Sequence, residues 1–171
     1  MHRLAETGAQ VSQTEDNLRT RFGEAMHRLL EGVPLGEVPS PGEGWPAGLL
    51  QRVAREFALG AGALADAVAM ADRILGGEGA WCWDPAQVDW ADNEVPLHVG
   101  GALRRIDRLV RTRVDGTWWV LDYKSAARPE DDPELRAQLT QYRDAVAAAH
   151  LGEPVRAAFL TGTGRLVVLQ S

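Results

Sequence analysis

The sequence predicts an α/β fold, a central mixed β-sheet flanked by helices, from two changes of pattern along its 171 residues. Apolar residues recur at helical spacing from about residue 15 to 31, and again from 133 to 149. After Gly76-Gly77 this period gives way to short runs rich in tryptophan and β-branched residues. Helices that alternate with such runs are typical of helices packed on the faces of one sheet.

Apolar periodicity, together with proline and glycine breaks, places the individual elements. Helices are expected at 15–31, 46–58, 62–75 and 133–149, and strands at 93–99, 102–113, 117–124, 155–160 and 165–169. Residues 1–14 are polar and unpatterned, so we expect them to be flexible. The stretch 33–76 combines a proline- and glycine-rich loop with two helices, which predicts a helical insertion within a single domain spanning 1–171.

Composition narrows the class of protein. No apolar run is long enough to span a bilayer, and the single Cys82 can form no internal disulfide, so we expect a cytoplasmic protein without a membrane partner. The net charge of −6 argues against a protein that grips nucleic acid by its backbone. A nucleic-acid enzyme of this charge would need metal ions at its acidic site, or DNA delivered by another domain.

Lys124 is the only lysine among the 18 basic residues; the others are arginine. Arginine codons replace lysine codons in a GC-rich genome wherever a generic positive charge suffices. A site that needs a compact, tunable ammonium group would keep its lysine, because arginine cannot supply one. The position of this lysine is therefore a clue to function.

A predicted hairpin gathers three charged residues around this lysine. Asp115-Gly116 is a strong signal for a two-residue turn, and that turn sets Asp107 opposite Lys124. Because side chains alternate between the faces of a strand, Asp107, Asp122 and Lys124 then share one face. The surrounding residues are nearly all apolar, so unpaired charges would be expensive there.

Two readings of this cluster are open. One is an inert cross-strand ion pair between Asp107 and Lys124, with Asp122 solvated at the strand end. The other is a hydrolytic site, in which paired carboxylates hold a magnesium-like cation. Such a cation activates water and stabilises the phosphoryl transition state, while the lysine orients or deprotonates the water. Two carboxylates and a lysine on an apolar sheet favour the second reading.

Asp107 followed by Asp122-Tyr123-Lys124 resembles the signature of the PD-(D/E)xK nuclease superfamily. The further matches, in order along the chain, are Gly23-Glu24-Ala25-Met26-His27, Glu94 and Gln138-Leu139-Thr140-Gln141-Tyr142. Together they resemble the C-terminal nuclease domain of RecB/AddA-type helicase–nucleases, which are exonuclease V-like enzymes with a UvrD/Rep-like helicase. The resemblance covers roughly residues 20–168.

The resemblance implies a restriction-endonuclease-like three-layer core and a metal-dependent DNA nuclease of recombination and repair. Asp107, Asp122 and Lys124 would be the catalytic residues. Mg²⁺ or Mn²⁺ would be bound by His27, Asp107, Asp122 and the backbone carbonyl of Tyr123. Taken alone, His27 would read as a partly exposed helix histidine.

The resemblance also assigns residues around this centre. Glu94 would lie in a second shell near the metal, and Gln138 and Tyr142, four apart on one helix face, would contact DNA phosphate or the metal shell. A plain packing role for Tyr142 is nearly as good a reading. Many relatives carry glycine three residues before the aspartate, where this chain has Arg104.

Further consequences concern cofactors and partners. Some relatives hold an iron–sulfur cluster on four cysteines, which one cysteine cannot do. No P-loop motif is present, so we expect no ATP site, and any helicase would be another domain or subunit, in cis or in trans. The alternative is a catalytically inactive nuclease-fold module for DNA-end binding or subunit assembly. The retained Asp107, Asp122 and Lys124 argue against it.

Overall fold

The computed structural model describes the backbone of residues 3–170 and the side chains of residues 17–170. The helices are α1 (Arg3–Glu31), α2 (Ala47–Glu56), α3 (Ala61–Gly76) and α4 (Pro133–Ala149), with short 3-10 segments η1 (Ala80–Trp83) and η2 (Pro129–Asp131). The strands are β1 (Val88–Val99), β2 (Ala102–Thr112), β3 (Trp118–Lys124), β4 (Val155–Thr161) and β5 (Leu166–Val168). Within the described residues, no helix has the length and apolar character needed to cross a membrane.

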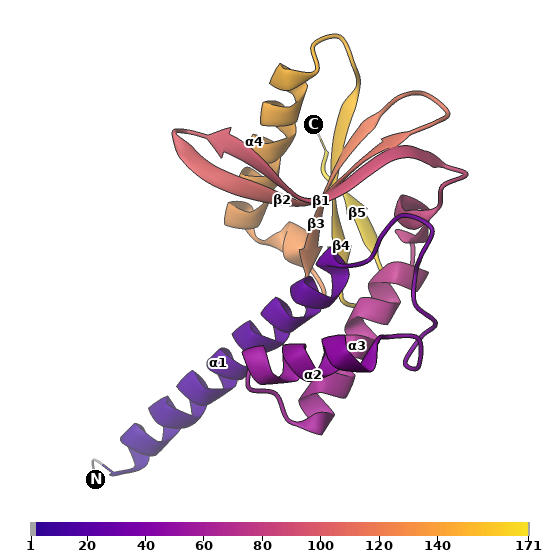
Figure 1. Cartoon of the computed structure of the whole chain (residues 1–171). Coiled ribbons are helices and arrows are strands. Elements are labelled where there is room, and N and C mark those ends of the chain that lie inside the picture. Colours follow the sequence, from indigo (N-terminus) through magenta and orange to yellow (C-terminus); the bar gives the residue numbers. More distant parts are fainter. Residues whose placement is uncertain (1–2, 171) are drawn as a thin grey trace.

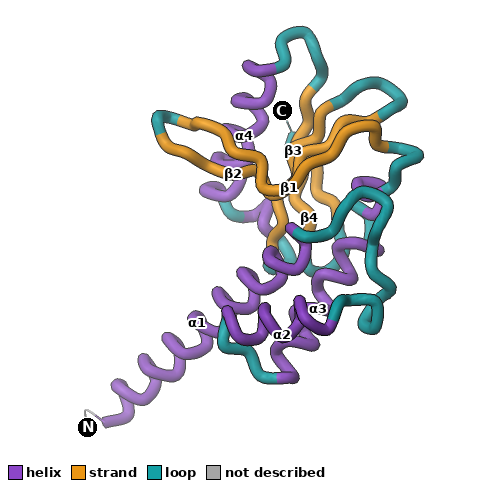
Figure 2. Tube along the Cα trace, viewed as in Figure 1, coloured by secondary structure: helices purple, strands orange, loops and turns teal. Residues whose placement is uncertain are grey.

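One five-stranded sheet forms the middle layer of the protein (Figures 1 and 2). The strands lie in chain order from β1 to β5; β3 and β4 run parallel, and every other neighbouring pair runs antiparallel. Helix α4 makes the crossover that a parallel pair requires between β3 and β4. A mixed sheet with helices on it confirms the α/β fold predicted from the sequence.

Each face of the sheet has its own apolar core. Leu121 and Tyr123 of β3 pack with α1, α2 and α3 on one face, whereas Trp118 and Val120 pack with α4 on the other. Burial on both faces explains why β3 reads as an almost unbroken apolar run. Asp122 is also buried and is the polar exception within that run. Because burying a carboxyl group is costly, its presence indicates a functional role for the strand.

Helix α4 begins and ends where the sequence places it. The side chain of Asp132 accepts a hydrogen bond of 2.9 Å from the Glu134 backbone N–H, as an N-cap does. Pro133 occupies the first turn, where its missing N–H costs nothing. The helix therefore starts at a defined residue, which sets the position of its inward face against the sheet.

The predicted start of the first helix at about residue 15 is wrong. Helix α1 begins at Arg3, and its N-terminal half projects away from the rest of the protein in Figure 1. Residues 3–14 carry no apolar period, but extending an existing helix costs far less than nucleating one. The packed segment that contains Met26 and Leu29 nucleates the helix, and the polar residues prolong it.

The predicted two-residue turn between β2 and β3 is also wrong. Four residues, 113–116, connect Thr112 to Thr117, and the Thr112 N–H donates to the Thr117 carbonyl at 3.0 Å. The Asp115 carboxylate accepts hydrogen bonds from the Thr112 hydroxyl and the Thr117 N–H. An aspartate that bonds the backbone ahead of it favours this wider turn.

The wider turn slips the hairpin by two residues. Arg111 pairs with Trp118 instead of Val120, and the ladder ends at the pair Arg108 and Leu121, so the predicted pair of Asp107 and Lys124 is not formed. Side chains repeat with period two, so a slip of two residues leaves the side chains of the paired residues on their predicted faces.

A kink at Glu94 exchanges the two faces of the outer part of the β1–β2 hairpin, so that side chains beyond it point to the opposite side of the sheet. Asn93 points to α1 and donates to the Glu31 and Val33 carbonyls, whereas Val95, two residues on, packs into the α4 core. Residues two apart in a strand ordinarily share a face. Glu94 has a positive φ of 52°, which reverses the alternation there.

The strain at Glu94 predicts an unusual order of stability. Glu94→Gly should unfold with a free energy about 1 kcal/mol higher than Glu94→Ala, because only glycine adopts positive φ without cost. Urea unfolding measures both. At His98, exposed on the same strand with ordinary backbone, alanine should be the more stable of the two. The strain argument fails if alanine is also the more stable residue at position 94.

Candidate active site

Strands β2 and β3 separate at Asp107. Their ladder ends at the pair Arg108 and Leu121, and beyond it the Asp107 carboxylate accepts the Tyr123 backbone N–H at 2.8 Å. This carboxylate replaces the carbonyl that a strand partner would have offered. The side chain therefore lies in the fork between the strands, where elements on both faces of the sheet can reach it.

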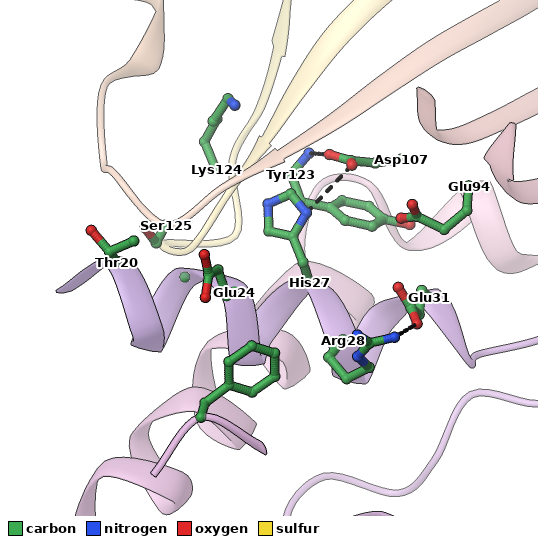
Figure 3. Close-up of a pocket in the computed structure, with 12 residues that line it drawn as sticks. Thr20, Glu24, His27, Arg28, Glu31, Glu94, Asp107, Tyr123, Lys124 and Ser125 are labelled. Carbon is green, nitrogen blue, oxygen red and sulfur yellow. Dashed lines mark hydrogen bonds and ion pairs between the residues drawn. The ribbon is translucent and has the colours of Figure 1, made fainter. Parts of the chain in front are cut away.

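His27 reaches the fork from α1. Its Nδ1 lies 3.3 Å from Asp107 Oδ1, and its ring contacts the Tyr123 ring edge to face with centroids 5.7 Å apart (Figure 3). The helix is held in place by its neighbours Met26 and Leu30, which are fully buried. His27 and Asp107, distant in sequence, are thus brought into contact.

Asp122 and Lys124 approach Asp107 from the α4 face of the sheet. The Asp122 carboxyl lies close enough to Asp107 for each to shift the pKa of the other, and Lys124 Nζ lies 3.4 Å from Asp122 Oδ2. Figure 3 shows Lys124 extending away from α1. Although the ammonium is near, Asp122 Oδ2 is buried and accepts no well-formed hydrogen bond. Asp122 therefore presents one oxygen with spare capacity for a cation.

The pKa values of Asp122, Asp107 and His27 are shifted in different directions by burial and by their neighbours. Burial, and next the charge of Asp107, raise the pKa of Asp122 to about 8. Burial also acts to raise the pKa of Asp107, but hydrogen bonds from His27, Asp122 and Tyr123 outweigh it and hold that pKa below its usual range. Burial acts to lower the pKa of His27, yet the hydrogen bond and charge of Asp107 raise it overall. Asp107 is the ionised carboxylate of the pair.

The chemistry of these groups fits a divalent cation. Two carboxylates in contact repel one another when ionised, and one of their oxygens lacks a hydrogen-bond donor. Carboxylate oxygens and a neutral imidazole are ligands that Mg²⁺ or Mn²⁺ accept. In the structure these side chains bond to each other, and among the described residues no group of three or more His, Cys, Asp or Glu is already arranged to hold a metal.

A cleft of about 540 Å³ opens beside His27 and Asp107, on the α1 side of the sheet. Its lining residues are Thr20, Gly23, Glu24, His27, Arg28, Glu31, Phe57, Glu94, Asp107, Tyr123, Lys124 and Ser125. Glu24 and Glu31 were missed in the sequence analysis. They stand three residues before and four after His27, a spacing that puts all three on one helix face and could have identified them.

Glu94 also lies in this cleft. Burial raises its pKa, and the charges of Asp107 and Glu31 add to the effect. The kink in β1 is what directs its carboxyl group here, because an unkinked strand would alternate differently. The glutamate near the predicted metal position is thus brought close to Asp107 by strained backbone.

Gln138 and Tyr142 lie elsewhere, on α4, and do not line the cleft. Tyr142 is buried and packs with Trp118 and Val120 of β3 on the α4 face of the sheet. Burial, and next the charge of Asp122, raise the pKa of Tyr142. The predicted site residues therefore gather on both faces of the sheet, with Asp107 between them.

A buried arginine that the sequence analysis missed supports the fork. Arg108 donates to the Cys82 carbonyl at 2.9 Å and to Asn93 Oδ1 at 2.7 Å, and its guanidinium lies 4.6 Å from the centre of the Trp83 ring. Asn93 in turn donates to carbonyls at the C-terminal end of α1. This network fixes α1, and so His27, against β2.

Comparison with known proteins agrees with this geometry. The chain matches the PD-(D/E)XK nuclease superfamily over residues 2–167, nearly its whole length. No curated protein matches it. The chain therefore belongs to the PD-(D/E)XK nuclease superfamily. It is a nuclease domain by family, with a hydrolase activity on nucleic acids, and such nucleases generally use divalent metal ions such as Mg²⁺.

The raised pKa of Asp122 predicts a pH dependence of stability in chelator. Its pKa is higher in the folded than in the unfolded protein, so its contribution is fully present below pH about 4 and is lost as the pH rises through about 8. Between pH 5 and 8 the unfolding free energy of the parent should fall relative to Asp122→Asn, by at most about 1.4 kcal/mol per pH unit.

Chemical unfolding at several pH values measures this difference. Asp144→Asn, at an exposed position on α4, is the matched control and should follow the parent. Parallel curves for the parent and Asp122→Asn would mean that the Asp122 carboxyl is not held in its neutral form.

Proposed function

We propose that this domain is a Mg²⁺- or Mn²⁺-dependent deoxyribonuclease of the RecB/AddA type, acting as an exonuclease V-like part of a helicase–nuclease in DNA recombination and repair. The observation that carries the proposal is the convergence of Asp107, Asp122 and Lys124 at the fork between β2 and β3, with His27 opposite. An inert surface ion pair does not explain it, because Asp122 is buried and lies against a second carboxylate.

His27, Asp107 and Asp122 would hold the metal, joined by the Tyr123 carbonyl, with Glu94 behind them. Each of the three side chains already contacts another of them, so short side-chain rotations would turn them to a shared ion. When bound, the ion supplies positive charge that activates water and stabilises the phosphoryl transition state. Asp107 would remain the anchor, because the Tyr123 N–H also orients it.

Lys124 would act on the attacking water. Its ammonium lies beside Asp122, within 3.4 Å of Oδ2, and can donate hydrogen bonds in three directions. In that position the ammonium would orient the water toward the phosphorus, and it could take a proton from the water only after it had given up one of its own. Gln138 and Tyr142, on the same side of the fork, would contact the DNA phosphate.

We further propose that residues 1–171 form one nuclease domain of a cytoplasmic enzyme, with 33–76 as a helical addition. A helicase domain or subunit, in cis or in trans, would deliver DNA and so offset the acidic net charge of −6. The direct test is degradation of linear and closed circular DNA in Mg²⁺ and in chelator. Loss of linear DNA alone, only in Mg²⁺, is expected; persistence of all DNA in both would refute the nuclease.

Metal binding should raise the melting temperature. A ligand that binds only the folded state stabilises it by mass action, by about 2.7 kcal/mol at a hundredfold excess over Kd. Saturating Mn²⁺ should therefore shift the melting curve of the parent upward, and the shift should be lost in Asp107→Ala. The control is Asp144→Ala, which should keep the shift. An equal response of the parent and Asp107→Ala to Mn²⁺ would place the metal elsewhere.

Lys124→Arg should fold, bind Mn²⁺ and cut DNA about a hundredfold or more slowly than the parent. Arginine keeps the positive charge and pairs at least as well with Asp122, so an ion pair would survive the change. Its guanidinium stays protonated and is bulkier, so water activation would not. Initial rates in Mg²⁺ measure the effect, and the Mn²⁺ melting shift reports an intact site. Near-parental cleavage would show that the lysine is structural.

A further inference from the structure

The outer part of the β1–β2 hairpin, residues 95–106, forms a two-stranded arm, here called the β-arm. β2 pairs with β3 only over residues 108–111, so the β-arm extends beyond that ladder, as Figure 1 shows. Val95, Leu97 and Val99 pack one side of it into the α4 core. The β-arm is therefore anchored, and its remaining surface is free of the sheet.

Two consecutive arginines lie on the β-arm and are both exposed. Arg104 pairs with Leu97, whose side faces α4, and Arg105 pairs with Pro96. Because successive side chains in a strand point to opposite faces, the two guanidinium groups lie on opposite sides of the β-arm. One side is that of Tyr142 and the other that of Glu94, whose pKa values respond to Arg104 and Arg105 respectively.

Neither guanidinium makes a hydrogen bond, ion pair or ring contact within residues 17–170. Most other arginines of this region are engaged: Arg28 with Glu31 and Glu56, Arg111 with Asp89, Arg165 with Glu130, and Arg108 with buried carbonyl and amide oxygens. The cation of the centre itself, Lys124, is occupied by Asp122. Arg104 and Arg105 are thus the free cations that border the acidic centre.

We propose that the β-arm is a DNA-backbone clamp, in which Arg104 and Arg105 each hold one phosphate, on the two sides of the bond to be cut. The proposal rests on the proposed nuclease function and extends it to substrate binding. A chain with a net charge of −6 needs local cations to hold a polyanion beside its carboxylates. Guanidinium suits the task because it pairs with phosphate through two parallel hydrogen bonds.

The position of Arg104 supports this assignment. It stands three residues before Asp107 on the same strand and on the α4 side of the β-arm, the side on which Tyr142 packs. A phosphate there would meet a guanidinium and a phenol together. Arg105, on the cleft side, would meet the phosphate on the other side of Asp107. The kink at Glu94 creates this division, since it sets which side of the β-arm each arginine occupies.

The test measures binding of a labelled oligonucleotide, single-stranded and duplex, in Mg²⁺ over a range of salt, in a Lys124→Ala background that does not cleave. Arg104→Ala and Arg105→Ala should each weaken binding about tenfold at low salt. Each should also lower the slope of log affinity against log salt by about 0.7 for single strands or about 0.9 for duplex. The double variant should lose about twice as much slope.

Arg52→Ala is the matched control, because Arg52 is an exposed arginine on α2 that likewise has no partner among residues 17–170. It removes the same charge and should leave both affinity and slope unchanged. The Mn²⁺ melting shift should persist in every β-arm variant, which shows that a loss of binding does not come from the fold or the metal ligands.

Two results would overturn the clamp, and they differ in what else they overturn. If the parent cuts DNA while the β-arm variants bind like Arg52→Ala, the clamp is wrong and the nuclease stands. If the parent neither binds nor cuts DNA in Mg²⁺, the nuclease and the clamp fall together. An equal loss of DNA affinity in Arg104→Ala, Arg105→Ala and Arg52→Ala would show that only the net charge of the protein matters, and would also refute the clamp.

Discussion

The hydrogen bond from the Tyr123 backbone N–H to Asp107 is the interaction on which the rest of the site depends. It ends the ladder between β2 and β3 with a carboxylate in place of a carbonyl, so the strands can part without leaving a buried N–H unsatisfied. The parted strands leave room for His27 from one face and Asp122 from the other. A continuous ladder would have closed the sheet at that point.

The carboxyl groups at this fork are stabilised by neighbouring protein groups and not by water. The Tyr123 N–H and His27 contact Asp107 and favour a low pKa for its carboxyl, while burial and the charge of Asp107 raise the pKa of Asp122. Such an arrangement costs stability unless a cation joins it. The network of Arg108 and Asn93 supplies the rigidity that keeps the groups together, because it ties the end of α1 to β1 and β2.

The strain at Glu94 has two structural consequences. It turns a carboxyl group into the cleft, and it turns over the β-arm so that apolar residues meet α4. Backbone strain of this kind persists only where the surrounding structure over-determines it. Here the Asn93 hydrogen bonds on one side and the Val95 packing on the other hold it. The division of Arg104 and Arg105 between two faces follows from the same kink.

The sequence by itself determined the order of the elements and the alternation of side chains along the paired residues of β2 and β3. Alternation has a period of two, so the paired residues of β2 and β3 kept their predicted faces even though the turn was four residues long and the register slipped. Apolar periodicity likewise predicted a helix over residues 133–149, the bounds that α4 has in the structure. These features depend on neighbours in the chain, which a sequence displays directly.

Only the tertiary structure decided which residues meet across the chain. The turn at Asp115, the kink at Glu94 and the buried Arg108 each result from contacts between segments that no local pattern encodes. Helix α1 extends to Arg3 because its packed half nucleates it, which residues 3–14 alone do not show. Glu24 and Glu31 join the cleft because α1 turns that face to the fork, a choice made by packing Met26 and Leu29 against the sheet.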